Sequence, residues 1–201
     1  MALSQRPRRV GMFGGAFDPP HRAHVALVRA AVQQLGLDRL YLLPTGDAWH
    51  KERTLTAAEH RLAMSRLAFD ALPAVQVDDR ELKRSGPTYS VDTLRELQAE
   101  HPGAQLHLLM GEDQAAGFTR WHAWQEIAGL AVLAVAGRGT GAGVAALSAL
   151  PNVRVELLTL PQMPESATDV RRRLTTGQDI TELVGPAVAR YIESHHLYQT
   201  P

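Results

Sequence analysis

Short apolar segments alternate with longer amphipathic segments along most of the 201-residue chain. The apolar segments have the length of buried strands, and the amphipathic segments repeat apolar positions every three or four residues, as helices do. This alternation predicts strand–helix–strand units around a parallel sheet. Strands are predicted near residues 8–13, 39–43, 74–78, 105–110, 130–136 and 153–158. Helices are predicted near residues 22–36, 57–70, 90–100, 121–128, 168–176 and 186–195.

The predicted fold class is α/β, with a doubly wound, mostly parallel sheet and helices on both faces. We expect a single domain over residues 1–201, whose C-terminal part, about 165–201, is helical. Thr56 and Glu59 form a capping-box pattern, and Pro186 suits the first turn of a helix. Because ligands of such sheets bind beyond the carboxyl ends of the strands, the loops there are expected to surround one cleft.

The stretch from Val10 to His24 reads V-G-M-F-G-G-A-F-D-P-P-H-R-A-H and is rich in candidate functional residues. Gly14 and Gly15 follow an apolar strand and allow a sharp turn whose backbone approaches a ligand closely. His21 and His24 come at the start of the next predicted helix and share one of its faces. Free backbone N–H groups, the helix dipole and two imidazoles would together stabilise an anion such as phosphate.

On the H-x-x-H spacing alone, a plainer interpretation is favoured, in which the glycines form an ordinary turn and the histidines are solvated surface residues. The zinc-helix pattern H-E-x-x-H is absent and the chain has no cysteine, so we expect no metal held by the two histidines. Neither the P-loop pattern nor the dinucleotide-binding pattern G-x-G-x-x-G is present.

A second candidate stretch, from Glu165 to Leu174, reads E-S-A-T-D-V-R-R-R-L. Ser166 or Thr168 can cap a helix whose first turns carry Arg171, which brings hydroxyls, free N–H groups and a guanidinium to one point. A triphosphate would bind favourably there. On composition alone, an ordinary capped basic helix is the favoured interpretation of this stretch.

Composition narrows the class of ligand. Lys plus Arg and Asp plus Glu both number 21, so the chain has no basic field of the kind that binds nucleic acid, and a small molecule fits better. The longest apolar run, Leu130 to Ala136, is too short to cross a bilayer, and no apolar run of signal-peptide length follows the basic N-terminus. We therefore expect a cytoplasmic protein with no membrane partner, and the sequence leaves open whether it forms a homo-oligomer.

The first stretch resembles the G-G-[ST]-F-D-P-x-H-x-G-H signature of the HxGH adenylyltransferase superfamily, which transfers the adenylyl group of ATP and has a Rossmann-like fold. Ala16 stands where the signature has Ser or Thr, and Ala23 stands where it has Gly. The second stretch is similar to the superfamily's phosphate segment I-S-[SA]-T-x-[IV]-R, with Glu165 in place of Ile. Both substitutions in the first stretch are small, so we expect altered fine contacts and retained chemistry.

Three further stretches resemble nicotinate mononucleotide adenylyltransferase: E-L-K-R-S-G-P-T-Y-S-V-D-T-L, G-E-D-Q-A-A-G-F-T-R-W and the pair His50–Lys51. The resemblance runs from about Val10 to the C-terminus. It implies that ATP and nicotinate mononucleotide give nicotinate adenine dinucleotide and pyrophosphate, with Mg²⁺ accompanying ATP.

The resemblance also implies roles for individual residues. Those implied to be catalytic are His21, His24 and Arg171. Those implied to contact ATP and its phosphates are Gly14, Gly15, Ala16, Phe17, Asp113, Arg138, Ser166 and Thr168. Those implied to contact the acceptor are His50, Lys51, Thr88, Tyr89 and Trp121. For His50–Lys51, a surface loop without a ligand is an equal alternative.

Two other functions stay open at this point. One is an adenylyltransferase of the same superfamily that acts on nicotinamide mononucleotide or phosphopantetheine, and the acceptor stretches argue against it. The other is a nucleotide-binding regulator without turnover, and the intact His21, His24 and Arg171 argue against that.

Overall fold

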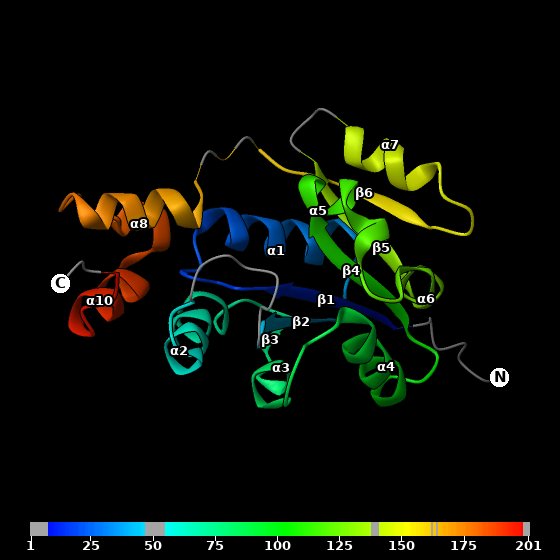
Figure 1. Cartoon of the computed structure of the whole chain (residues 1–201), viewed down its shortest axis with the longest axis horizontal. Coiled ribbons are helices and arrows are strands. Elements are labelled where there is room, and N and C mark those ends of the chain that lie inside the picture. The colour runs from blue at the N-terminus through cyan, green and yellow to red at the C-terminus, as the bar shows by residue number, and fades with distance from the viewer. Residues whose placement is uncertain (1–7, 47–54, 138–140, 162, 164, 199–201) are drawn as a thin grey trace.

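The computed structural model describes residues 8–46, 55–137, 141–161, 163 and 165–198, and it has a central parallel sheet covered by helices (Figure 1). The strands that it describes are β1 Arg9–Gly15, β2 Arg39–Pro44, β3 Val75–Val77, β4 Gln105–Gly111, β5 Ala131–Gly137 and β6 Val155–Thr159. They lie in the order β3-β2-β1-β4-β5-β6 with parallel pairing at each step. The strand order reverses beside β1, so the sheet is doubly wound, as predicted.

The helices described are α1 Arg22–Gln34, α2 Ala58–Phe69, α3 Arg80–Lys83, α4 Ser90–Glu100, α5 Glu112–Ala116, the 3₁₀ helix η1 Phe118–Arg120, α6 Trp124–Leu130, α7 Ala142–Ser148, α8 Ala167–Thr175, α9 Thr181–Val184 and α10 Pro186–Ser194. Each predicted strand and helix has a counterpart among these elements. The helix predicted near 121–128 begins later than predicted, because Trp121 caps η1 and α6 begins at Trp124. The sequence prediction missed α3, α5, η1, α7 and α9.

Two layers of apolar side chains cover the sheet, one on each face. The cluster on one face includes Met12 of β1 together with residues of α4 and α6. The cluster on the other face includes Phe13 of β1 together with residues of α1 and Phe69 of α2. Because successive residues of a strand point to opposite faces, β1 is buried on both sides and the sheet is sandwiched between helices.

A third apolar cluster joins α2 to the C-terminal helices. It contains Met64 of α2, Val170 of α8, Val184 of α9, and Val188 and Ile192 of α10. Figure 1 shows α8 and α10 gathered at the left, at the end of the sheet toward which β1 runs. This packing fixes the C-terminal helices beyond the carboxyl end of β1, where a doubly wound sheet binds its ligands.

The helix-start predictions have different outcomes. Pro186 occupies the first turn of α10, as predicted. The capping box of Thr56 and Glu59 is wrong: Ala57 is the N-cap of α2, with no side-chain cap, and the Thr56 backbone N–H donates to the Asp18 carboxylate at 3.2 Å. No helix in the described part of the chain is long and apolar enough to cross a membrane.

Candidate active site

The end of β1 and the loop after it carry the first group of predicted phosphate-binding residues. Gly14 and Gly15 are the last residues of β1 and pair with β2, so the sharp turn predicted at these glycines is wrong and the chain leaves the strand after Gly15. Gly14 has open space where a Cβ would lie, so a ligand can approach its backbone, whereas a Cβ on Gly15 would lie 3.0 Å from the Phe17 ring. Phe17 has a φ of 45°, a left-handed value that bulky residues rarely adopt. Its side chain is 2% exposed and packs edge-on against Phe13 and Phe69. The ring therefore anchors the loop in the core, which leaves only the Phe17 backbone to face a phosphate.

The two histidines lie together at the start of α1, as their spacing predicted. His21 is the N-cap residue and is buried, and the ring centroids of His21 and His24 are 3.8 Å apart. The His21 backbone N–H donates to Nδ1 of His24 at 3.3 Å. Because Nδ1 accepts this bond, a neutral His24 carries its proton on Nε2, the form that can donate to an anion.

The predicted phosphate segment forms the first turns of α8. Ser166 is the N-cap, and its Oγ accepts from the Asp169 backbone N–H at 3.1 Å. Arg171 donates from Nη2 to Oγ1 of Thr168 at 3.1 Å. The segment is therefore a capped helix start that carries two hydroxyls and a guanidinium, as expected.

A direct contact joins the two segments. Arg171 donates from Nη1 to the backbone carbonyl oxygen of Asp18 at 2.7 Å, across 153 residues of sequence. Asp18 lies three residues before His21 in the loop after β1. The structure thus brings Arg171 to the loop that carries His21, an arrangement on which phosphate oxygens can be bound from two sides.

Arg61 of α2 is a buried cation that the sequence prediction missed. It is 3% exposed and donates to three backbone carbonyls, those of Ala16, Thr45 and Thr56. These carbonyls lie after β1, after β2 and before α2. Arg61 therefore ties together the loops at the carboxyl end of the sheet, and a basic residue within a predicted helix gave no signal of that role.

The predicted acceptor residues lie around the start of α4. Tyr89 is its N-cap residue, and its ring lies 4.2 Å from the His122 ring. The Oγ1 atom of Thr88 is buried and has no hydrogen-bond partner among the described residues. Trp121 is half-buried and, like Tyr89, packs against the apolar cluster that contains Met12. His122, which the sequence analysis did not select, therefore joins the predicted acceptor residues, and its only signal was its position next to Trp121.

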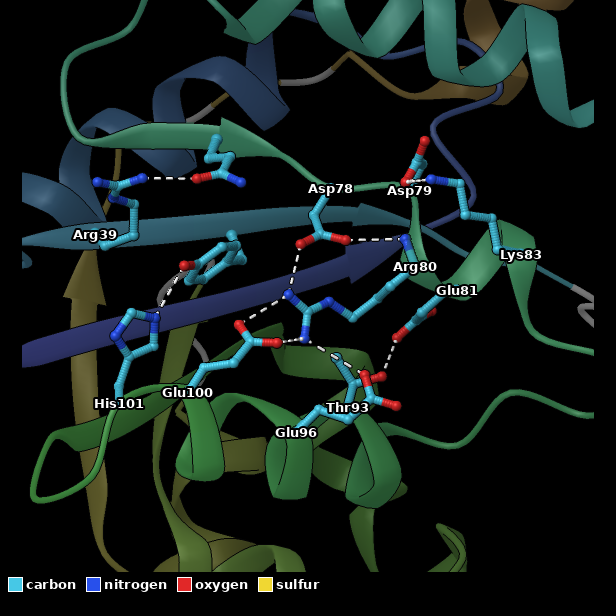
Figure 2. Close-up of polar contacts among 12 residues, drawn as sticks. Arg39, Asp78, Asp79, Arg80, Glu81, Lys83, Thr93, Glu96, Glu100 and His101 are labelled. Atoms are coloured by element: carbon cyan, nitrogen blue, oxygen red, sulfur yellow. Dashed lines mark hydrogen bonds and ion pairs between the residues drawn. The ribbon is translucent and has the colours of Figure 1, made fainter.

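An ion-pair network holds α3 against α4 (Figure 2). It thereby fixes both ends of the loop of residues 84–89, which contains Thr88. Arg80 contacts Asp78 and Glu100 at 2.7 Å each, and Glu96 at 3.4 Å. Its guanidinium also lies 5.6 Å from the centre of the Tyr41 ring on β2. The network therefore links the loop to the sheet as well as to the helix.

Glu81 is a buried carboxylate on α3. It is 3% exposed and accepts a hydrogen bond from the Thr93 hydroxyl at 2.8 Å (Figure 2). Burial raises the pKa of Glu81 to about 7, despite the opposing effects of Thr93 and Arg84. Gly46 packs on its backbone so closely that a Cβ there would lie 2.2 Å from the Glu81 carbonyl oxygen. Only glycine fits at this point of contact between the loop after β2 and α3.

The remaining candidates are less fully placed. Asp113 is exposed in the first turn of α5, just beyond the carboxyl end of β4. Glu165 is half-buried, and its Oε2 has no hydrogen-bond partner among the described residues. His50, Lys51 and Arg138 lie outside the described residues. Across the described residues no group of three or more His, Cys, Asp or Glu side chains could hold a metal ion.

Known proteins are similar to this chain over nearly its whole length. A cytidylyltransferase-like family model matches residues 12–173. A probable nicotinate-nucleotide adenylyltransferase of Albidiferax ferrireducens is 53% identical, over 96% of this chain and 99% of its own length. One from Methylibium petroleiphilum is 42% identical, over 96% of this chain and 94% of its own.

A solved structure supports the fold. The Plasmodium falciparum nicotinic acid mononucleotide adenylyltransferase complexed with NaAD matches 95% of this chain and 97% of its own, with a TM-score of 0.76 and 20% sequence identity. The predicted Rossmann-like α/β fold is thereby confirmed. On the similarity of its sequence to these relatives, the chain belongs to the nicotinate-nucleotide adenylyltransferase family.

Proposed function

We propose that the protein transfers the adenylyl group of ATP to nicotinate mononucleotide, giving nicotinate adenine dinucleotide and pyrophosphate in NAD biosynthesis. The observation that carries this proposal is the contact of Arg171 with the loop of His21 and His24. That contact joins two phosphate-binding elements at the ligand-binding end of a doubly wound sheet. Family membership supports the same reaction.

The chemistry needs no general base. A phosphate oxygen of the acceptor, already ionised at neutral pH, attacks the α-phosphorus of ATP, and the bond from that phosphorus to the oxygen shared with the β-phosphate breaks. The electron pair of the broken bond leaves with pyrophosphate. Catalysis then consists of aligning the two substrates and stabilising the charge on the transferred group and the leaving group.

The described residues suit these tasks. His24 would donate from Nε2 to the α-phosphate, with His21 beside it. Arg171 contacts both the Asp18 loop and Thr168, and from that position its guanidinium would donate to the β- and γ-phosphates. Ser166 and Thr168 would contribute hydroxyls, and the open backbone at Gly14 would admit the phosphates.

We assign Mg²⁺ to the substrate, as MgATP. Mg²⁺ commonly keeps several water ligands and binds through substrate phosphates, with few protein carboxylates. The described part of the chain has no cluster of acidic and histidine side chains for such an ion. Asp113 and Arg138 are proposed to bind on the ATP side, on the family pattern alone.

The acceptor is proposed to bind between the start of α4 and the segment from Trp121 to His122. An aromatic surface there would stack on the pyridine ring, and the buried Thr88 hydroxyl would donate to its carboxylate. The amide of nicotinamide mononucleotide would present an NH₂ group to the same donors. Sites built on matched hydrogen bonds reject such a mismatch by roughly 10⁴-fold. His50 and Lys51 are proposed to contact the acceptor phosphate.

A coupled pyrophosphate assay tests the proposal, with MgATP and three acceptors: nicotinate mononucleotide, nicotinamide mononucleotide and phosphopantetheine. We expect rapid pyrophosphate release with the first acceptor alone. Comparable kcat/KM for the acid and the amide would refute the carboxylate-selective pocket. ATP binding without pyrophosphate release from any acceptor would refute the enzymatic function.

A further inference from the structure

Asp18 is a buried carboxylate in the middle of the candidate catalytic loop. It is 2% exposed, and both of its oxygens accept hydrogen bonds. Oδ2 accepts from the Thr56 backbone N–H at 3.2 Å, and Oδ1 accepts from the hydroxyl of Tyr198 at 2.5 Å. A buried carboxyl group without such partners costs free energy, so the loop conformation depends on the groups that supply them.

Tyr198 reaches Asp18 from a position 180 residues away in the sequence. Its backbone has a φ of 64°, a left-handed value that a tyrosine adopts only where its surroundings hold it. Its ring packs against the third apolar cluster, formed by α2 and α8–α10. Burial and the adjacent Asp18 carboxylate raise the pKa of Tyr198, so its hydroxyl stays protonated and donates.

Asp18 is also the residue to which Arg171 binds. The side chain of Asp18 accepts from Tyr198, and its backbone carbonyl accepts from Arg171. Three residues later the chain reaches His21, the N-cap of α1. If the Asp18 side chain lost its partners and the backbone at Asp18 changed conformation, both the carbonyl that binds Arg171 and the start of the helix that carries the histidines would be displaced.

We propose that Tyr198 is a positioning residue for adenylyl transfer, which acts by holding the Asp18 carboxylate so that His21, His24 and Arg171 keep their relative places. Only the kinetic part of this inference rests on the proposed function. Tyr198 itself makes no contact with substrate, so its loss should act on turnover through the placement of those three residues and leave acceptor binding unchanged.

The chain offers a matched control in Tyr191 of α10. Its hydroxyl also makes a hydrogen bond across the third cluster, to Nδ1 of His60 at 2.9 Å. His60 lies on α2, and the bond does not involve the catalytic loop. Tyr198→Phe and Tyr191→Phe each remove one hydroxyl and keep the ring, so a purely structural role predicts similar effects for both.

Steady-state kinetics of the full-length variants give the first test. We expect Tyr198→Phe to lower kcat about tenfold while the KM for the acceptor changes less than about twofold, and Tyr191→Phe to keep the wild-type kcat. In an Asp18→Asn background, Tyr198→Phe should add little further loss, because the two residues act through one contact. Equal kcat in the two tyrosine variants, both folded by circular dichroism, would overturn the inference.

Hydrogen exchange in the free protein gives a test that does not depend on turnover. We expect faster amide exchange in the peptide from residue 15 to residue 24 in Tyr198→Phe, and wild-type exchange there in Tyr191→Phe. Unchanged exchange in Tyr198→Phe would overturn the positioning role even if the wild-type enzyme were active. Faster exchange together with an inactive wild type would support the contact and refute the proposed function instead.

Discussion

At the scale of single residues, the proposed chemistry depends most on His24. Its Nδ1 accepts from the backbone of His21, which commits Nε2 to donation. We expect His24→Ala to lower kcat by about 10²–10³-fold, because one well-placed donor to a developing charge contributes about that much. The measurement is pyrophosphate release at saturating substrates, with thermal unfolding to confirm that the variant is folded. A variant with wild-type kcat would remove His24 from the mechanism.

Thr88 allows a prediction in which a gain in stability accompanies a loss of acceptor selectivity. Its hydroxyl is buried without a hydrogen-bond partner among the described residues, an arrangement that costs about 1–3 kcal/mol. Thr88→Val should therefore raise the free energy of unfolding by about 1 kcal/mol or more, while it narrows the preference for the acid over the amide acceptor.

Thr93→Val is the matched control for this prediction. The Thr93 hydroxyl is buried as well, but it donates to Glu81 at 2.8 Å. Its removal should lower the free energy of unfolding, which urea denaturation of both variants would measure. If Thr88→Val destabilised the protein as Thr93→Val does, the Thr88 hydroxyl would have a structural partner in place of a ligand.

At the scale of secondary-structure elements, Glu81 makes the contact between α3 and α4 sensitive to pH. Its pKa in the folded protein is about 7, against 4.5 for the free side chain, so the folded state binds the proton more tightly. The resulting stability is fully present below pH 4.5 and is lost as the pH rises through about 7. The pKa difference corresponds to roughly 3 kcal/mol.

Glu81→Gln should remove this dependence, because an amide does not titrate. The free energy of unfolding of the variant, relative to wild type, should rise between pH 5 and about 7 and then level off. Urea denaturation at intervals of one pH unit would measure it, with the exposed Glu193→Gln as control. Parallel pH profiles for wild type and Glu81→Gln would show that Glu81 is ionised throughout this range.

The elements also show how much of the fold can be predicted from the sequence. The longer strands and helices were predicted correctly because their apolar pattern extends over several residues or turns. In β5, for example, Ala131–Gly137 is an almost wholly apolar run. The missed helices α3 and α9 have four residues each, too few for a period to be detected. Motif spacing correctly placed His21 and His24 at a helix start. The contacts of Asp18 with Arg171 and Tyr198 span 153 and 180 residues, and no local pattern encodes them.

At the scale of the whole molecule, the candidate ATP site joins the first strand to the C-terminal helices. Arg171 of α8 contacts Asp18 after β1, and Val170 beside it packs into the cluster with α2 and α10. A ligand that binds both sides of this junction stabilises the folded state against separation of the two parts. At a concentration of 100 times Kd, such a ligand adds about 2.7 kcal/mol to the free energy of unfolding.

A non-hydrolysable ATP analogue with Mg²⁺ should therefore raise the melting temperature by about 5–10 °C at that concentration, as expected for a chain of this length. In Arg171→Lys the same analogue concentration should give a clearly smaller rise, because a bidentate fork is replaced by a point charge and affinity falls. Arg190→Lys changes an exposed arginine on α10 in the same way and should keep the full shift. Differential scanning fluorimetry of the three proteins measures the effect. Equal shifts in all three proteins would show that the ATP phosphates bind away from α8. The proposed role of Arg171 would then be wrong.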